Sequence, residues 1–303
     1  MTHLVLASSS TLSYFQAVVL GLLQGVTELF PISSLGHTVI FPSLFGWHKL
    51  VAAQSASESF WLAFVVLLHV GSALGLLAYF WRDWVEIITA FFHTLVTRKI
   101  STPTERLAWL IIIASIPAAV LGLALEHTLR TITAKPEIAS IFLVVNGFLL
   151  LGAEQARRRA AVRELAVREG AKPDGGRQLG TLDFREAGII GVAQSTALVA
   201  GISRDGVCMG AGLSRGLDHS DSARFAFLLA TPIILGAGIV KIGDITGPLG
   251  AGVRGQALVA CLVAAVAALF TVRFLVRWFR SRTLTPFAVY CLLFGTAMVF
   301  YNA

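Results

Sequence analysis

Charge and paired cysteine are both scarce in this sequence. Aspartate, glutamate, lysine and arginine make up 14% of the 303 residues, against about 25% in an ordinary soluble domain. The three cysteines, Cys208, Cys261 and Cys291, stand apart in apolar sequence and form no CxxC or other metal-ligand spacing. This arrangement excludes a dithiol redox motif and is typical of inert packing residues. The shortage of charge excludes a soluble globular domain and indicates a protein integral to a membrane.

Apolar runs take the place of the missing charge. Hydrophobic residues make up 56% of the chain, and the mean hydropathy is +0.77. Because the runs recur over the whole length, they predict one all-α polytopic membrane domain over 1–303. They also predict a shorter interfacial helix over 84–96. The six predicted transmembrane helices are at about 60–81, 107–125, 138–153, 223–243, 256–272 and 286–302.

The basic residues predict how these spans are oriented. They concentrate at 82–106, 154–186 and 273–285, and basic loops stay in the cytoplasm. Positive-inside orientation, and not nucleic-acid binding, explains the net charge of +7. Both termini then lie outside, and 154–186 is an exposed cytoplasmic loop that can hold a helical turn or two. The segments 12–50 and 187–222 must each begin and end on one side of the membrane.

Each of those two segments is either a pair of spans or a re-entrant helical hairpin. Each carries a helix-breaking polar motif in its middle. Non-helical backbone at membrane depth survives only where protein or a wet cavity satisfies it. We therefore favour two re-entrant helical hairpins that enter from opposite faces.

The first polar motif is QGVTELFPISSLGH, which opens at Gln24. Gln24 and Glu28 are four residues apart and share a helix face. Pro31 lacks an N–H and ends that helix, after which one of the two following serines can cap the next helix. His37 falls in the first turn of this second helix. Free N–H groups and the positive dipole end make such a turn an anion site.

The second motif is QSTALVAGISRDG, which opens at Gln194. Both motifs read Q-x7-I-S-x-x-G, with an offset of 170 residues and no gap. Gly201 and Gly206 flank Ser203 and Arg204 and allow a close backbone approach. A guanidinium binds phosphate bidentately, so Arg204 is the residue expected to hold a phosphate group.

Together the motifs predict one site for phosphate chemistry. Interrupted helices in two inverted halves point to a site near the midplane, and we place these repeats at about 12–153 and 187–303. The first hairpin supplies Ser34 or His37 as nucleophile or base, with Glu28 as an orienting carboxylate. The second hairpin supplies the arginine clamp.

Each of these residues also has a structural interpretation. Glu28 and Arg204 can simply neutralise each other inside the protein. Pro31 and the serines after it can form a kink with back-bonded hydroxyls. His37 can be a packed, hydrogen-bonded histidine. His69, within the first predicted span, either faces the site or makes an interhelical bond.

At these residues the sequence resembles the bacterial undecaprenyl-diphosphate phosphatase family, the integral-membrane type linked to bacitracin resistance. The family carries a Glu- or Gln-xxx-Glu motif running into P-x-S-S-x-G-H, which QGVTELFPISSLGH matches throughout. Its second motif, P-G-x-S-R-S-G, is matched by AGISRDG except at Ala200 and Asp205. RFAFLLATP, at 224–232, resembles the family's phenylalanine-rich helix start. HVGSALGLLAYFWRDW resembles its glutamine-glycine-serine span, with His69 in the glutamine's place.

The resemblance implies an enzyme of the bacterial inner membrane that removes the terminal phosphate from undecaprenyl diphosphate. The product is the monophosphate lipid carrier of peptidoglycan precursors, and the site faces the outer side. By position, the acidic motif falls on Gln24 and Glu28, the catalytic serine and histidine on Ser34 and His37, and the phosphate-binding arginine on Arg204. The remaining substrate-binding candidates are Ser33, Ser203, Gly201 and Gly206.

A divalent cation, Mg²⁺ or Ca²⁺, is expected beside the diphosphate, with Glu28 and Asp205 as its candidate ligands. Asp205 otherwise repels the phosphate or orients Arg204. The sequence leaves open whether Ser34, His37 or water is the nucleophile, and whether the chain forms a homodimer. One rival class is an inverted-repeat lipid or small-anion transporter or flippase, which would release no phosphate. Another is an intramembrane serine protease, for which no G-x-S-G motif is present.

Overall fold

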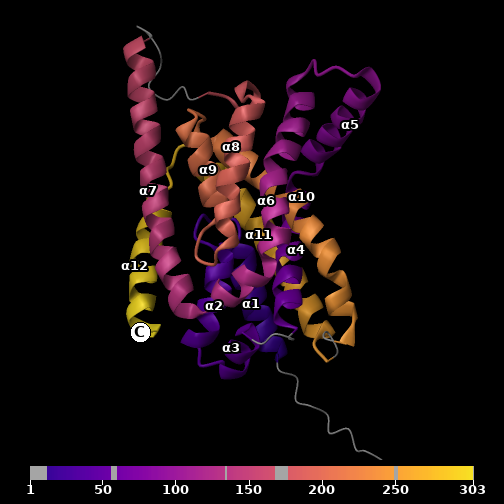
Figure 1. The fold of residues 1–303 in the computed structure, drawn as a ribbon, viewed down its shortest axis with the longest axis vertical. Helices are drawn as coiled ribbons and strands as arrows, with labels where there is room; N and C mark the ends of the chain where they lie inside the picture. The colour runs from indigo at the N-terminus through magenta and orange to yellow at the C-terminus, as the bar shows by residue number, and fades with distance from the viewer. Residues whose placement is uncertain (1–11, 56–59, 134, 168–176, 249–251, 303) are drawn as a thin grey trace, which may run out of the picture.

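The protein is a bundle of helices, most of which run roughly along its long axis (Figure 1). The structure is a computed structural model that describes residues 12–55, 60–133, 135–167, 177–248 and 252–302. Over these residues it contains no β-strand, which confirms the all-α prediction. The α-helices are α1 (Tyr14–Thr27), α2 (Ser34–Leu44), α3 (His48–Ser55), α4 (Trp61–Tyr79), α5 (Trp81–Thr97), α6 (Pro103–Thr133), α7 (Pro136–Val167), α8 (Phe184–Ser195), α9 (Arg204–Ser214), α10 (His219–Thr246), α11 (Arg254–Trp278) and α12 (Thr285–Asn302). Two 3-10 helices, η1 (Leu179–Thr181) and η2 (Thr196–Leu198), flank α8.

Six of the helices in the described part of the chain are long and apolar enough to cross a membrane. They are α4, α6, α7, α10, α11 and α12, and they coincide with the six predicted spans. The shorter helix predicted over 84–96 is α5, whose side chains Val85, Ile88 and Phe92 are exposed. The protein is therefore a multi-pass membrane protein.

Helix α7 differs from the prediction of a loop over 154–186. The helix continues to Val167, because residues 154–167 are mostly alanine, arginine and glutamate, which favour helix in water. A helix of 32 residues is about 48 Å long, whereas the hydrocarbon core of a bilayer is about 30 Å thick. The charged end of α7 therefore extends past the apolar part of the bundle. Residues 168–176 of the predicted loop lie outside the described residues.

The basic segments gather at one end of the molecule. Figure 1 shows α5 and the end of α7 at the top, opposite the C-terminus. The third basic segment joins them, because Glu154 accepts a hydrogen bond from the backbone N–H of Leu284 at 2.6 Å. This common end is the one that the charge pattern assigns to the cytoplasm.

Small residues bring α1 and α4 close to α11. A Cβ atom on Gly25 of α1 would lie 2.4 Å from the carbonyl oxygen of Ala264, and one on Gly71 of α4 would lie 2.3 Å from that of Cys261. Close backbone approach at small residues is the usual packing of membrane helices. Since α1 and α4 share this support, the end of α1 that carries Glu28 is held beside the middle of α4.

Four short helices form two similar pairs. The starts of α1 and α8, the starts of α2 and α9, and the ends of α2 and α9 all differ by 170 residues, the offset of the sequence motifs. Capping boxes begin α1 and α8 at the same offset, from Ser13 with Gln16 and from Asp183 with Glu186. In Figure 1, α1 and α2 lie in the lower half and α8 and α9 in the upper half. Re-entry of the two pairs from opposite membrane faces, and the division into repeats, stay predictions.

Candidate functional site

Both motifs place a serine directly before a helix. Ser33 caps α2 by accepting a hydrogen bond on Oγ from the N–H of Gly36 at 3.2 Å. Ser203 caps α9 in the same way, accepting from the N–H of Gly206 at 3.1 Å. The shared letters I-S-x-x-G thus correspond to a shared structure, a serine N-cap with glycine at the third helical position. The two helices start next to each other, because the turns before them are joined.

Two side chains join the turns. Ser33 Oγ also accepts a hydrogen bond from the N–H of Gly201 at 3.1 Å. Asn146 of α7 donates from Nδ2 to the carbonyl of Pro31 at 2.9 Å and accepts on Oδ1 from the N–H of Ser203 at 2.9 Å. Sequence reasoning missed Asn146. The signal was available, because a lone amide in the middle of an apolar span must find partners inside the protein.

Gly201 is at the point of closest approach in the second turn. Its φ is +103°, and a Cβ atom there would lie 2.4 Å from the carbonyl oxygen of Ala139. The position therefore needs glycine, both for its backbone conformation and for the lack of space around it. This agrees with the close backbone approach expected there.

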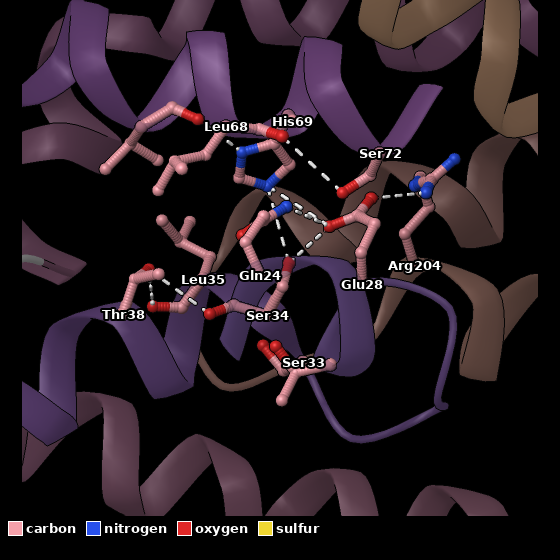
Figure 2. Close-up of polar contacts among 12 residues, drawn as sticks. Gln24, Glu28, Ser33, Ser34, Leu35, Thr38, Leu68, His69, Ser72 and Arg204 are labelled. Atoms are coloured by element: carbon pink, nitrogen blue, oxygen red, sulfur yellow. Dashed lines mark hydrogen bonds and ion pairs between the residues drawn. The ribbon is translucent and has the colours of Figure 1, made fainter. Parts of the chain in front are cut away.

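Glu28 is the centre of a buried polar cluster between the two helix starts (Figure 2). Its Oε1 accepts a hydrogen bond from Arg204 Nη2 at 2.6 Å. Its Oε2 accepts from Gln24 Nε2 at 2.9 Å and, at very short range, from the hydroxyl of Ser34. The structure thus brings together these four predicted site residues from segments that lie 176 residues apart.

His69 completes the cluster from α4. Its Nε2 lies 3.3 Å from Glu28 Oε2 and 3.4 Å from Ser34 Oγ. Its Nδ1 lies 2.7 Å from the carbonyl oxygen of Val65, one turn earlier. The sequence left two roles open for His69, and the structure places it in the site.

A cavity of about 200 Å³ adjoins the cluster. Its polar wall includes Glu28, Ser34, His69 and Arg204, and most of the rest is apolar, from α4, α6 and α10. Two helix N-termini, those of α2 and α9, open on this one space. Converging N–H groups and dipole ends favour an anion there. In the part of the chain that is described, the second guanidinium nitrogen, Arg204 Nη1, is buried and has no hydrogen-bond partner.

His37 is not part of this cluster. Its Nδ1 contacts the carbonyl oxygen of Ser33 at 2.7 Å, and its Nε2 contacts the hydroxyl of Tyr290 at 2.8 Å. The ring stacks against Tyr290 and Phe294 of α12. The structure therefore does not bring His37 together with Glu28 and Ser34, because the ring lies over the carbonyl four residues earlier.

Asp205 is fully buried beside the guanidinium group. Its Oδ1 lies 3.3 Å from Arg204 Nη2, and within the described residues neither of its oxygens has a hydrogen-bond partner. The contact fits an orienting role for Asp205. It does not fit a resident divalent cation, since Arg204 lies against both this carboxylate and Glu28. The residues described contain no group of three histidine, cysteine, aspartate or glutamate side chains that could hold a metal.

Known proteins are similar to this chain over almost its whole length. The family model described as bacitracin resistance protein BacA matches residues 17–297. The chain is 48% identical to "Undecaprenyl-diphosphatase 2" of Frankia alni, over 94% of this chain and 96% of that protein. It is 50% identical to "Undecaprenyl-diphosphatase" of Mycolicibacterium paratuberculosis, over 96% of this chain and 98% of that protein. It is 49% identical to "Undecaprenyl-diphosphatase" of Mycobacterium avium, over 97% and 99%.

Proposed function

The chain belongs to the family described as bacitracin resistance protein BacA, and from this membership and the geometry of the cluster we propose that it is an undecaprenyl-diphosphate phosphatase. The reaction is hydrolysis of the phosphoanhydride bond, which gives undecaprenyl phosphate and inorganic phosphate. The structural observation that carries the proposal is Arg204. Among the described residues its Nη1 has no hydrogen-bond partner, and Arg204 lines an apolar cavity that Ser34 also lines. A guanidinium in that setting suits a phosphate on a lipid.

The terminal phosphate is held between the two helix starts. Arg204 Nη1 and the first-turn N–H groups of α2 and α9 neutralise its equatorial oxygens, which carry the charge of the transition state. Glu28 keeps Arg204 in place through the 2.6 Å contact. Asp205 lies against the same guanidinium nitrogen, Nη2, at 3.3 Å.

Ser34 is the attacking group. Its Oγ lies on the cavity wall and is hydrogen-bonded to Glu28 and close to His69, which is the arrangement of an activated serine. Attack on the terminal phosphorus forms a phosphoserine and releases undecaprenyl phosphate, and water then hydrolyses the phosphoserine. His37 takes no part in these steps and packs the start of α2 against α12.

The lipid chain leaves the site through the apolar side of the cavity. Val66, Ile233 and Ile234 line that side, on α4 and α10. Only the diphosphate then occupies the polar end. The protein acts in the bacterial inner membrane with this site open to the outer side, as its relation to cell-wall synthesis and bacitracin resistance implies. A homodimer stays a prediction.

A divalent cation would be held here mainly by the substrate. Glu28 already accepts hydrogen bonds on both oxygens, so the diphosphate oxygens are the main ligands left for Mg²⁺ or Ca²⁺. Such an ion would supply further charge neutralisation on the diphosphate. None of the steps above depends on it.

The test is phosphate release from undecaprenyl diphosphate by purified protein in detergent, with and without Mg²⁺ or Ca²⁺. Ser34→Ala should abolish release. Ser43→Ala, on the same helix but hydrogen-bonded to Asn302, should retain it. Acid quenching should trap phosphoserine on the peptide that contains Ser34. Absence of phosphate release from folded wild-type protein under all these conditions would refute the assignment and favour the transporter class.

A further inference from the structure

The tautomer of His69 is fixed by its own helix. Its Nδ1 lies 2.7 Å from the carbonyl oxygen of Val65, and a carbonyl oxygen only accepts, so Nδ1 carries the hydrogen. In the neutral ring, Nε2 therefore presents a lone pair. That lone pair lies 3.4 Å from Ser34 Oγ and 3.3 Å from Glu28 Oε2. Two acceptors therefore meet at one hydroxyl: Glu28 Oε2 accepts its hydrogen bond at very short range, and His69 Nε2 lies farther away. The question is which of them takes the proton when Ser34 attacks.

Glu28 is a poor acceptor for the proton of Ser34. It already accepts from Arg204 at 2.6 Å and from Gln24 at 2.9 Å. Taking the proton of Ser34 would neutralise Glu28 and leave the guanidinium of Arg204 buried beside an uncharged acid, which is costly. Protonation of His69 leaves the ion pair of Glu28 with Arg204 intact. The imidazolium that forms lies 3.3 Å from the carboxylate of Glu28, which stabilises it.

We propose that His69 is the catalytic base of this enzyme, an inference that rests on the proposed phosphatase function. As Ser34 Oγ forms its bond to the terminal phosphorus, its proton moves to His69 Nε2. The bond between that phosphorus and the bridging oxygen breaks, and its electron pair leaves with undecaprenyl phosphate. Glu28 stays ionised throughout, pairing first with Arg204 and then also with the imidazolium.

The second half-reaction returns the proton. Water attacks the phosphoserine, and its hydroxyl goes to phosphorus as the bond to Ser34 Oγ breaks. Ser34 Oγ recovers the proton held on His69 Nε2. The remaining proton of the water leaves with inorganic phosphate, so the enzyme ends in its starting state.

The ring of His69 has few charged neighbours, since position 24 carries an amide, Gln24. The charged groups that face the ring are Glu28 and, beyond it, Arg204, while its other neighbours in the cavity wall, such as Val66 and Ala118, are apolar.

The test starts from His69→Gln, because glutamine keeps a hydrogen-bond acceptor but cannot hold the proton. The kcat for phosphate release should fall by about 100-fold or more, while KM stays within about threefold because the phosphate clamp is intact. The matched control is Ser72→Ala, one turn along α4, whose hydroxyl bonds the carbonyl of Leu68 at 3.5 Å in the described part of the chain (Figure 2). It should behave as wild type.

Two rescues separate a base from a structural residue. Imidazole added to His69→Gly should restore release in a dose-dependent way. The double variant Gln24→Glu with His69→Gln should also recover kcat, because a second carboxylate beside Glu28 forms a pair that can share one proton. Recovery in either experiment supports the proposal, since imidazole returns a base that is not tied to the chain and the double variant rebuilds none of the packing of the ring.

Three results would each overturn a different part of the proposal. Phosphate release that is lost in Ser34→Ala but keeps its kcat within threefold in His69→Gln overturns the base and leaves the phosphatase standing. A loss in His69→Gln that neither imidazole nor Gln24→Glu repairs assigns His69 to structure and also overturns the proposal. A wild-type protein that releases no phosphate refutes the proposed function itself.

Discussion

The turn before α2 and the turn before α9 share one capping pattern but carry different chemistry. Each has a serine cap, a glycine three residues later and the same spacing from a preceding glutamine. At the first helical position, however, one has Ser34 and the other has Arg204. Six residues before each of these stand Glu28 and Leu198, and both line the same cavity. One turn therefore brings the nucleophile and its carboxylate, and the other brings the cation and an apolar wall.

This difference shows how a duplicated element can build an asymmetric site. The cap and the glycine fix where each helix starts, so the side chain at that position points into the shared space. A single residue at each helix start then decides its function. Ser34 supplies the nucleophile and Arg204 supplies the phosphate clamp, on the same capping pattern. Breaking either half should have a different, measurable consequence.

The largest effect should come from Arg204→Ala. Phosphate release should fall about 10³-fold, since a transition-state donor is lost, and the unpaired carboxylate of Glu28 should destabilise the fold by about 3–5 kcal/mol. Arg204→Lys should release phosphate at a rate between those of wild type and Arg204→Ala, because lysine keeps the charge without the planar fork. Adding Glu28→Gln to Arg204→Ala should restore the melting temperature in detergent but not activity. An unchanged melting temperature in Arg204→Ala would contradict the pairing.

The connection between the turns should break in Asn146→Ala. This change leaves the carbonyl of Pro31 and the N–H of Ser203 without their buried partner, which should cost about 2–4 kcal/mol. Ser140→Ala is the control, because its hydroxyl bonds only within α7. Thermal unfolding of both variants in detergent measures the difference. Equal melting temperatures would mean that Asn146 does not hold the turns together.

The two motif glycines should respond unequally to alanine. A Cβ atom on Gly36 would lie 3.0 Å from the backbone Cα of Gly201, whereas one on Gly206 would lie 3.0 Å from the tip of the Leu150 side chain. Backbone cannot move as a leucine methyl can, so Gly36→Ala should cost about 1–3 kcal/mol. Gly206→Ala should cost less than about 1 kcal/mol. A larger loss of unfolding free energy in Gly206→Ala would reverse this order.

The smallest effect is a difference in pH dependence between the capping boxes that begin α1 and α8. Hydrogen bonds from Arg177 hold the pKa of Glu186 below its usual value, whereas Gln16 in the matching box does not titrate. Because the pKa is lowered in the folded protein, Glu186 adds stability above its unfolded pKa and loses it as the pH falls through the folded value. Unfolding measured at pH 7 and near pH 3 should show a loss below about 1 kcal/mol that Glu186→Gln lacks. An identical pH dependence in that variant would exclude the effect.

Sequence patterns predicted the scaffold better than the side-chain directions. The six spans followed from apolar length, and a serine cap on α2 followed from the helix break at Pro31. The cap at Ser203 was not predicted. The meeting of Glu28 with Arg204 followed from the cost of leaving either charge alone in a membrane. His37 was expected in the site because it stands near Ser34 in sequence. Its ring instead bonds the carbonyl of Ser33, and only the packing against α12 decides that.

Other features depend on partners that the sequence does not pair. Asn146 was missed because its two hydrogen-bond partners come from turns 115 and 57 residues away. The role of His69 stayed open because a histidine within a span can face any neighbour. The helical extension of α7 is longer than the turn or two expected, because a charged stretch was interpreted mainly as a loop although its residues favour helix in water.

The most direct test of the shared site is a structure with a lipid diphosphate analogue whose bridging oxygen is a methylene group. The terminal phosphonate should lie between the starts of α2 and α9, with Arg204 Nη1 as its donor and Ser34 Oγ facing its phosphorus. The lipid should leave past Val66 and Ile233. A phosphonate bound elsewhere, with Arg204 still engaged only by Glu28 and Asp205, would contradict a phosphate site built from both turns.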